Sequence, residues 1–324
     1  MSSSVASMRN WLNPALPILS IQIHENECAW VYGQVTRNEY LKFKSVDASG
    51  VCGSNPSLLE QGGRVSPMGV SALLEGVLGA LGSGYPSPKG LVFSLPSRKH
   101  FLGGLSVSSQ DSDEDIQFHV QEVLENVAGQ SVEPMAYDWR DKAGTAQLGE
   151  RSLALAAIHQ SQLDALQSAC AERKLKCLGV TLDNIAGLNG YMQGVKMTPN
   201  LEQARFLLLG ELNPHAVRLS IFMEGMPFHE TWDHSSEGFS AIQAISAMEG
   251  LVSIWSRGVN LLDSSSIALI LGGSLMTHKS TEQILKRSAI LSPWWVPSAP
   301  VMGLSKDWHE VVVPFGAVEG MPCG

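Results

Sequence analysis

Residues 267–276, with the sequence IALILGGSLM, constrain the fold of this chain more than any other segment. The five apolar residues predict a strand that is buried on both faces of a sheet, and the Gly-Gly pair predicts a tight turn after it. In open α/β folds, ligands bind beyond the carboxyl ends of such strands. The segment therefore predicts an α/β protein with a candidate binding turn at Gly272, Gly273 and Ser274, although Gly-Gly also ends many ordinary strands.

Composition predicts a folded, non-secreted protein with two domains. The chain has 324 residues, of which 44% are hydrophobic and 16% charged, and this length and balance are typical of globular domains. The net charge of −9, with no cluster of Lys and Arg, argues against nucleic-acid binding. The N-terminus lacks the features of a signal peptide, and no apolar run reaches the ~18–20 residues of a membrane span. We therefore expect a cytoplasmic protein.

The cysteines are odd in number and scattered along the sequence. No CxxC pair occurs, so the spacing predicts neither a zinc site nor a disulfide framework, and a reducing compartment fits best. The five residues are Cys28, Cys52, Cys170, Cys177 and Cys323.

The first half of the chain alternates strand and helix patterns after a loose N-terminus at 1–16. Residues 46–66 are rich in Gly, Ser and Asn and predict a loop, and Ser112 and Asp115 form a capping box that opens a helix. Ser161 and Asp164 suggest a second helix start of the same kind. Strands are predicted at 18–23, 29–35, 41–46, 90–95, 153–158 and 178–182, and helices at 70–81, 116–127, after 161 and at 185–192.

The second half repeats the order of the first. Thr198 and Pro199 suggest a hinge, and both halves begin with three strands before helices and strands alternate. The sequence thus predicts two duplicated α/β lobes, at 17–196 and 203–324, with an inserted α+β subdomain at about 97–155 in the first. Second-half strands are predicted at 206–212, 216–223, 227–232, 267–271 and 310–314, and helices at 239–255 and near 282–287.

This ordered set resembles the actin-like ATPase superfold, and within it the type IV pilus assembly protein PilM family, with its HofM and MshI relatives. The likeness covers roughly residues 17–320. One part that carries the likeness is GLVFSLPSRKHFLGGLSV with the acidic helix start after it. Another is LALAAIHQSQLDALQSACAERKLKCLGVTLDNIAGLNGY, in which Asp183 stands at the position of the Asp that ends the matching strand in the family. The segments PFHETWDHSSEGF, IALILGGSLM and VVVPFGAVEG complete it.

The resemblance implies a nucleotide cleft, but this chain departs from the pattern there. Nucleotide-binding members hold phosphates with two Asp-x-Gly turns. Here Gln22 and His24 replace the Asp and Gly of the first turn, and Ala29 stands where PilM has a Lys. Glu211 and Asn213 replace them in the second, which leaves Gly272, Gly273 and Ser274 as the adenosine-side turn. Gln22 cannot supply a charged ligand to Mg²⁺, so we expect no catalysis, no required cofactor and no metal, with residual ATP binding left open.

The family's function implies a non-catalytic cytoplasmic scaffold of a pilus inner-membrane platform. The implied partner is a PilN-like single-pass membrane protein whose N-terminal cytoplasmic peptide lies between the first lobe and the inserted subdomain. The candidate contact residues are Phe93, Leu95, Val120 and Leu124. Membrane association would be peripheral, through the partner, and homo-oligomerisation stays open. Two alternatives remain: a nucleotide-binding actin-like ATPase, and a GspL-like component of a type II secretion platform.

Other clusters in the sequence have simpler explanations. His229, Glu230, Asp233 and His234 alternate along a predicted strand, so they should not converge on a metal. The acidic residues at 111–115 favour the positive end of the helix that they open. The pair Trp294-Trp295 fits either packing under a loop or contact with a partner, and we favour packing.

Overall fold

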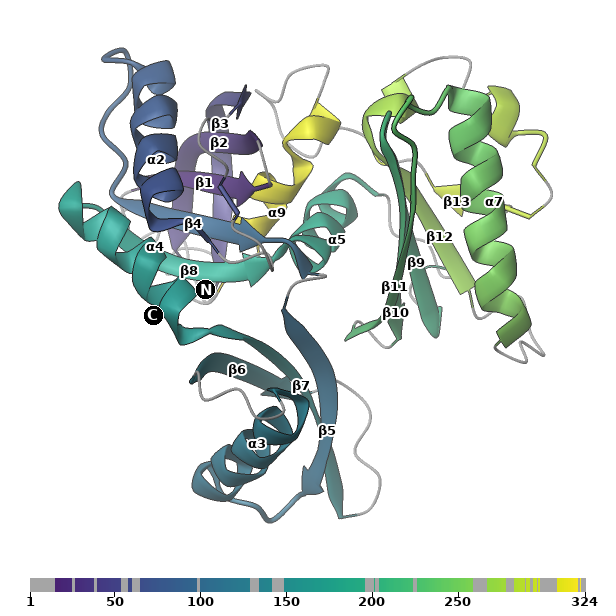
Figure 1. The fold of residues 1–324 in the computed structure, drawn as a ribbon, viewed down its shortest axis with the longest axis horizontal. Coiled ribbons are helices and arrows are strands. Elements are labelled where there is room, and N and C mark those ends of the chain that lie inside the picture. The colour runs from purple at the N-terminus through teal and green to yellow at the C-terminus, as the bar shows by residue number, and fades with distance from the viewer. Residues whose placement is uncertain are drawn as a thin grey trace, which may run out of the picture.

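The computed structural model describes residues 15–24, 27–37, 40–53, 58–59, 65–97, 100–128, 134–141, 149–195, 201, 204–223, 226–258, 267–277, 283–288, 290–291, 294–295, 297, 308–319 and 321. These residues form two five-stranded sheets, one in each lobe, and a smaller three-stranded sheet. Figure 1 shows the first lobe on the left, the second on the right and the smaller sheet below.

The first-lobe sheet has the strand order β3-β2-β1-β4-β8. Its first three strands form an antiparallel meander, and β4 and β8 join in parallel. From Ile18 to Ile23 every residue of β1 is buried, which explains its nearly continuous apolar sequence. The elements are β1 (Leu16–Ile23), β2 (Glu27–Arg37), β3 (Leu41–Gly53), α2 (Pro67–Leu81), β4 (Gly90–Leu95), α4 (Gln160–Glu172), β8 (Lys176–Leu182) and α5 (Asp183–Gly194).

The second-lobe sheet repeats this arrangement with the order β11-β10-β9-β12-β13. A meander is again followed by parallel strands, so the duplication predicted from the pattern of elements is present in the sheets. Trp294 and Trp295 form β13 and pack against hydrophobic cores, as expected. The elements are β9 (Phe206–Leu212), β10 (Ala216–Met223), β11 (Met226–His234), α7 (Ala241–Gly258), β12 (Ile267–Gly272), η3 (Ser274–Thr277) and β13 (Trp294–Trp295).

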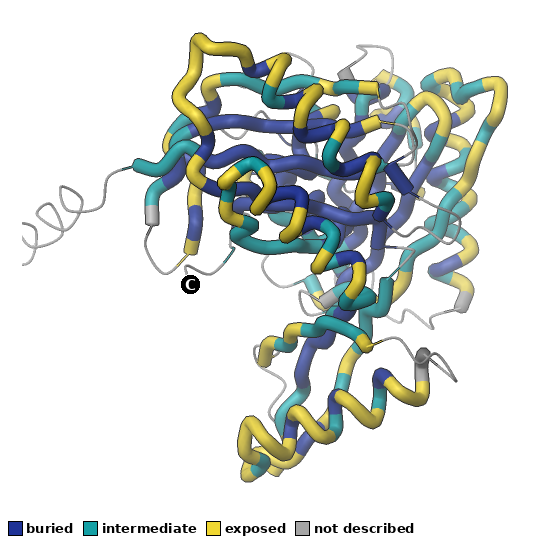
Figure 2. Tube along the Cα trace, turned by 60° about the vertical axis from the view of Figure 1, so that its left-hand side comes forward, coloured by how far each residue is buried: buried dark blue, intermediate teal, exposed yellow. Residues whose placement is uncertain are grey.

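A separate subdomain is inserted between β4 and α4. It consists of β5 (Phe101–Ser108), α3 (Asp113–Ala128), β6 (Met135–Asp141) and β7 (Glu150–His159), with the strand order β5-β7-β6. The predicted capping box is confirmed: the Ser112 amide donates to the Asp115 carboxylate at 3.0 Å, and the Asp115 amide donates to Ser112 Oγ at 3.3 Å. Figure 2 shows that this subdomain extends away from the main body and that its helix is largely exposed.

Three predictions about the secondary structure were wrong: two boundaries and one element type. β3 continues to Gly53 through the predicted loop, because an edge strand can carry the small and polar residues found there. The predicted strand at 310–314 is a short helical turn, η4 (Trp308–Glu310), followed by the helix α9 (Val312–Val318), because a fully buried apolar run fits either structure. α4 begins at Gln160, so Ser161 is not its N-cap. The predicted hinge at Thr198 lies outside the described residues.

The two lobes share one hydrophobic core. Phe315 of α9, Val31 of β2 and Leu209 of β9 all belong to the same cluster of buried side chains. α9 and α5 approach closely, since a Cβ on Gly316 would lie 1.9 Å from the Ala186 carbonyl oxygen and 2.3 Å from the Gly190 nitrogen. The cluster therefore joins both sheets through the helices α5 and α9, which contact each other at Gly316.

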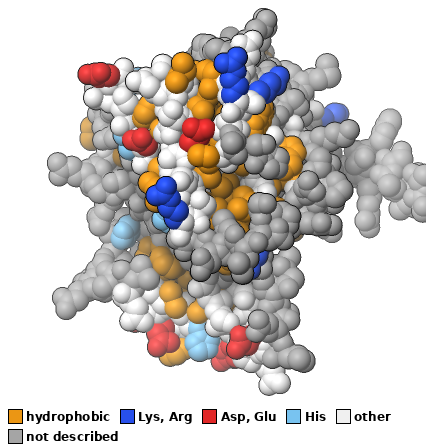
Figure 3. Space-filling model, turned by 90° about the vertical axis from the view of Figure 1, so that its right-hand side faces the viewer, with side chains coloured by type: hydrophobic (Ala, Val, Ile, Leu, Met, Phe, Trp, Pro, Cys, Tyr) orange, Lys and Arg blue, Asp and Glu red, His pale blue; other side chains and the backbone are white. Residues whose placement is uncertain are grey.

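The outer side of the second lobe is formed by α7. Ile242 and Ile254 on this helix are exposed, and the face in Figure 3 shows hydrophobic side chains among scattered charges of both signs. Among the described helices, none combines the length and the apolar character that a bilayer crossing requires.

We predict that Gly316→Ala destabilises the protein by at least about 2 kcal/mol, because its methyl group would overlap the α5 backbone. Gly79→Ala on the exposed side of α2 is the control: it meets nothing within 4 Å, and it should stabilise by about 0.5–1 kcal/mol. Urea unfolding measures both, and equal effects would contradict the tight α5–α9 contact.

Candidate functional site: a bonded cleft and a groove

The facing ends of the two lobes are joined around one buried arginine. Arg218 of β10 is 4% exposed and lies among three carboxylates. It forms ion pairs with Glu211 of β9 and with Asp183 at the start of α5, the latter at 2.9 Å between Nη1 and Oδ2. Glu230 of β11 lies farther away, with 3.9 Å between its Oε1 and the same Nη1. The guanidinium also lies 5.0 Å from the centroid of the Trp232 ring.

Neutral polar groups extend this cluster across the cleft. Ser97, which follows β4, donates from its amide to Asp183 Oδ1 at 2.9 Å and from its hydroxyl to Glu230 Oε2 at 2.6 Å. Asn184 Nδ2 donates to the same Glu230 oxygen at 3.2 Å. Ser97, Asp183 and Asn184 come from the first lobe, and Arg218 and Glu230 from the second. The polar network therefore bonds one lobe to the other.

The electrostatics divide the three carboxyl groups. Burial opposes ionisation of Asp183, but Arg218 and the Ser97 amide outweigh it and lower its pKa. Burial raises the pKa of Glu211 and of Glu230, and the attraction of Arg218 does not fully compensate. Burial also opposes charging of Arg218, yet the three acids raise its pKa. The pKa shifts thus favour an ion pair between a cationic Arg218 and an ionised Asp183. Because three acids face one cation, the region is unfavourable for further negative charge.

The Gly-Gly turn after β12 is also engaged within the protein. The Gly273 amide donates to Tyr191 Oη at 2.8 Å, and the Ser274 amide donates to Asn213 Oδ1 at 2.9 Å. The Tyr191 ring lies directly over Gly272, where a Cβ would approach it to 2.2 Å. Gly273 has φ +97°, so the turn requires glycine at that position. The backbone donors of this turn are therefore paired with side chains of α5 and of the segment after β9.

The structure brings only some of the predicted nucleotide-site residues together. Glu211 lies beside Gly272 as its partner in the pairing of β9 and β12. Gln22 is buried on the other sheet, next to Ser94.

Arg218, Tyr191 and Glu230 are the residues that the sequence analysis missed as site residues. A signal for Arg218 was present: one arginine in the buried run AVRLSIFM needs a charged partner. His229, Asp233 and His234 are not part of this network, and among the described residues no group of His, Cys, Asp and Glu could hold a metal ion.

A groove of about 740 Å³ lies between the inserted subdomain and the first lobe. One wall is β8 and the opposite wall is β6, and among the described strands each is the last one in its sheet. On β7, Leu153 and Leu155 pack towards α3, while the alternate residues Ala154 and Ala156 line the groove. Small side chains on this face leave room for an extended chain between two unpaired strand edges.

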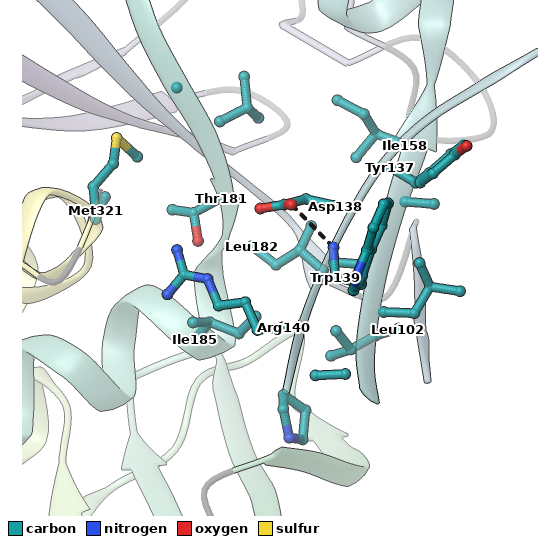
Figure 4. Close-up of a pocket in the computed structure, with 18 of the residues that line it drawn as sticks. Leu102, Tyr137, Asp138, Trp139, Arg140, Ile158, Thr181, Leu182, Ile185 and Met321 are labelled. Atoms are coloured by element: carbon teal, nitrogen blue, oxygen red, sulfur yellow. Dashed lines mark hydrogen bonds between the residues drawn. The ribbon is translucent and has the colours of Figure 1, made fainter. Parts of the chain in front are cut away.

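Apolar and polar side chains both reach the groove. Figure 4 shows Leu102, Ile158 and Leu182 along it, and Arg140 of β6 pointing towards Thr181 of β8. Asp138 lies nearby and accepts a hydrogen bond from the Trp139 amide at 3.0 Å. Met321 closes one end, where its sulfur lies over Gly179. The groove is thus mainly apolar, and its charged lining residues are Arg140, Asp138, Asp141 and Glu319.

The four predicted partner-contact residues do not line this groove. Phe93 and Leu95 are buried in the first-lobe core, and Val120 and Leu124 are buried in the separate core of the inserted subdomain. The four side chains lie in the hydrophobic cores of the two units that form the walls of the groove.

Comparison with known proteins shows the fold. No protein-family model and no curated protein matches the chain. The solved structure of the PilM-PilN type IV pilus biogenesis complex is similar over 93% of this chain and 98% of that chain, with a TM-score of 0.60 and 13% sequence identity. A Bacteroides thetaiotaomicron protein of unknown function with an actin-like ATPase fold matches over 92% of this chain and 95% of that one (TM-score 0.43, 11% identity). The cytoplasmic domain of EpsL, an inner-membrane component of the Vibrio cholerae type II secretion system, matches over 80% and 83% (TM-score 0.44, 10% identity).

The chain therefore has the actin-like ATPase fold, with two duplicated α/β lobes. In fold it is similar to a chain of the PilM-PilN type IV pilus biogenesis complex, which agrees with the resemblance seen in its sequence.

We predict that Arg218→Met costs about 3–5 kcal/mol of stability, because it leaves two buried carboxyl groups and the partly buried Glu230 without their cation. Arg151→Met is the matched control. Arg151 pairs with Asp141 on the surface, so its loss should cost much less stability than the loss of Arg218. Chemical unfolding of both variants tests this, and an Arg218 variant as stable as the control would show that the ion pairs do not join the lobes.

Proposed function

We propose that this protein is a non-catalytic scaffold that captures an extended peptide in the groove between β8 and β6. The proposed ligand is the N-terminal cytoplasmic segment of a PilN-like single-pass membrane protein in a pilus or related secretion platform. The protein would then lie on the cytoplasmic side of the inner membrane and associate with it through this partner. The observation that carries the proposal is a mainly apolar groove with an unpaired strand edge on each side.

Backbone pairing is the physical basis for peptide capture. An unpaired edge presents N–H and C=O groups that an extended chain can complete, and apolar side chains beside the edge supply affinity. The alanines of β7 and β6 give the groove its depth, and Arg140 with the nearby Asp138 and Asp141 offers the peptide polar contacts of both signs. Similarity in fold to PilM from the PilM-PilN complex supports the choice of partner.

The contacts that fill the region between the two lobes support the proposal that the protein is not an enzyme. The residues there do not fit a magnesium nucleotide, because the Gly273 and Ser274 amides are already paired and Tyr191 covers Gly272. Three carboxyl groups around Arg218 would also repel phosphates.

Calorimetric titration with Mg-ATP should therefore give no measurable binding and no turnover, and micromolar binding with hydrolysis would favour an ATPase instead.

We predict that Ala136→Arg weakens peptide binding at least tenfold, because Ala136 is a small residue on the groove-lining edge strand β6. The ligand is a synthetic N-terminal peptide of a PilN-like protein, and fluorescence anisotropy measures its Kd.

Gln117→Arg is the matched control, because it adds the same side chain on the exposed face of α3, which does not line the groove. The control should bind like the unmodified protein. Equal affinity of both variants would place the peptide elsewhere, and no binding by the unmodified protein at high micromolar concentration would overturn the proposed partner.

A further inference from the structure

The cysteines that look scattered in the sequence meet in two pairs in the first lobe. Four of the five are described, and all four have free thiols. Cys28 of β2 and Cys52 of β3 are direct partners in the antiparallel pairing of these strands. Cys170 at the end of α4 contacts Cys177 at the start of β8. All four side chains belong to or pack against one hydrophobic core.

The geometry of the Cys28–Cys52 pair suits a disulfide. Residues directly opposite on antiparallel strands have Cα atoms about 4.5–5.5 Å apart and side chains on the same face. A disulfide spans Cα separations of about 4.4–6.8 Å, so it needs no backbone movement here. The two thiols are also within hydrogen-bonding reach of each other.

The two thiols differ in their access to solvent. Cys28 is fully buried, and burial raises its pKa to about 12, so it rests as a protonated thiol. Cys52 is partly exposed, and it lies on β3, the edge strand of the described sheet. A reagent in solution therefore reaches Cys52 first.

We propose that Cys28 and Cys52 form a reversible dithiol–disulfide site that exchanges with small-molecule disulfides such as oxidised glutathione. The Cys52 thiolate attacks one glutathione sulfur, the glutathione S–S bond breaks, and one glutathione leaves as its thiol. Cys28 then gives up its proton and attacks Cys52 Sγ, which releases the second glutathione thiol. The two cysteines are oxidised by two electrons, and one disulfide of glutathione is reduced to two thiols.

The new bond would fasten the open end of the β2–β3 hairpin. Cys28 follows the turn at the end of β1, and Cys52 is the next to last residue of β3. In a reducing compartment the site rests as two thiols, and it closes when the glutathione pool becomes oxidising. This proposal is independent of the peptide groove and would survive the loss of the proposed partner.

The test equilibrates the full-length protein with glutathione buffers from fully reduced to fully oxidised. Free thiols are then alkylated, and intact mass and peptide mapping follow. We expect the oxidised protein to carry two fewer alkyl groups than the reduced protein, a linked Cys28–Cys52 peptide that dithiothreitol separates, and a melting temperature about 5 °C higher in the oxidised form.

Two serine variants complete the experiment. Cys52→Ser should lose the linked peptide and the shift in melting temperature, while Cys177→Ser, which also removes one thiol of a pair, should keep both. Alkylation of both Cys28 and Cys52 in fully oxidised buffer would overturn the proposal. A glutathione adduct on Cys52 that never resolves to the linked peptide would overturn it as well.

Discussion

The buried ion pair between Arg218 and Asp183 joins the two lobes, and the rest of the site is arranged around it. Arg218 lies in the second-lobe sheet and Asp183 begins a first-lobe helix. Desolvating both groups is expensive, so the pair persists only where further hydrogen bonds complete it. Ser97 and Asn184 provide those bonds from the first lobe, through Asp183 and Glu230.

The same contacts are the basis for our proposal that this actin-like architecture works without a nucleotide. In such folds a bound nucleotide and its metal would occupy the cleft between the lobes. Here side chains of the chain itself bond across it, and a shared apolar core packs behind them. If the proposed function holds, the groove between β8 and β6 would keep its shape independently of ATP, because α5 lines that groove and also carries Tyr191 and Asp183.

The groove and the cleft use the sheets in different ways. In the cleft, side chains from both lobes form ion pairs and hydrogen bonds around Arg218. In the groove, strand edges stay unpaired beside a face of small side chains. An unpaired edge invites association with other chains unless it is protected, and β6 and β7 of the inserted subdomain line the groove opposite β8. A pairing-competent edge is thus kept within a narrow space.

The sequence alone determined most elements of the two lobes and their duplication, because periodicity and turn residues are local properties. It also placed Glu211 and the Gly272–Gly273 turn at strand ends. It could not decide that VVVPF forms a helix, since a fully buried apolar run has no diagnostic period. Nor could it bring Arg218 to Asp183, or Cys28 to Cys52. These contacts join residues far apart in the chain, and only the pairing of strands and the docking of the lobes put them within bonding distance.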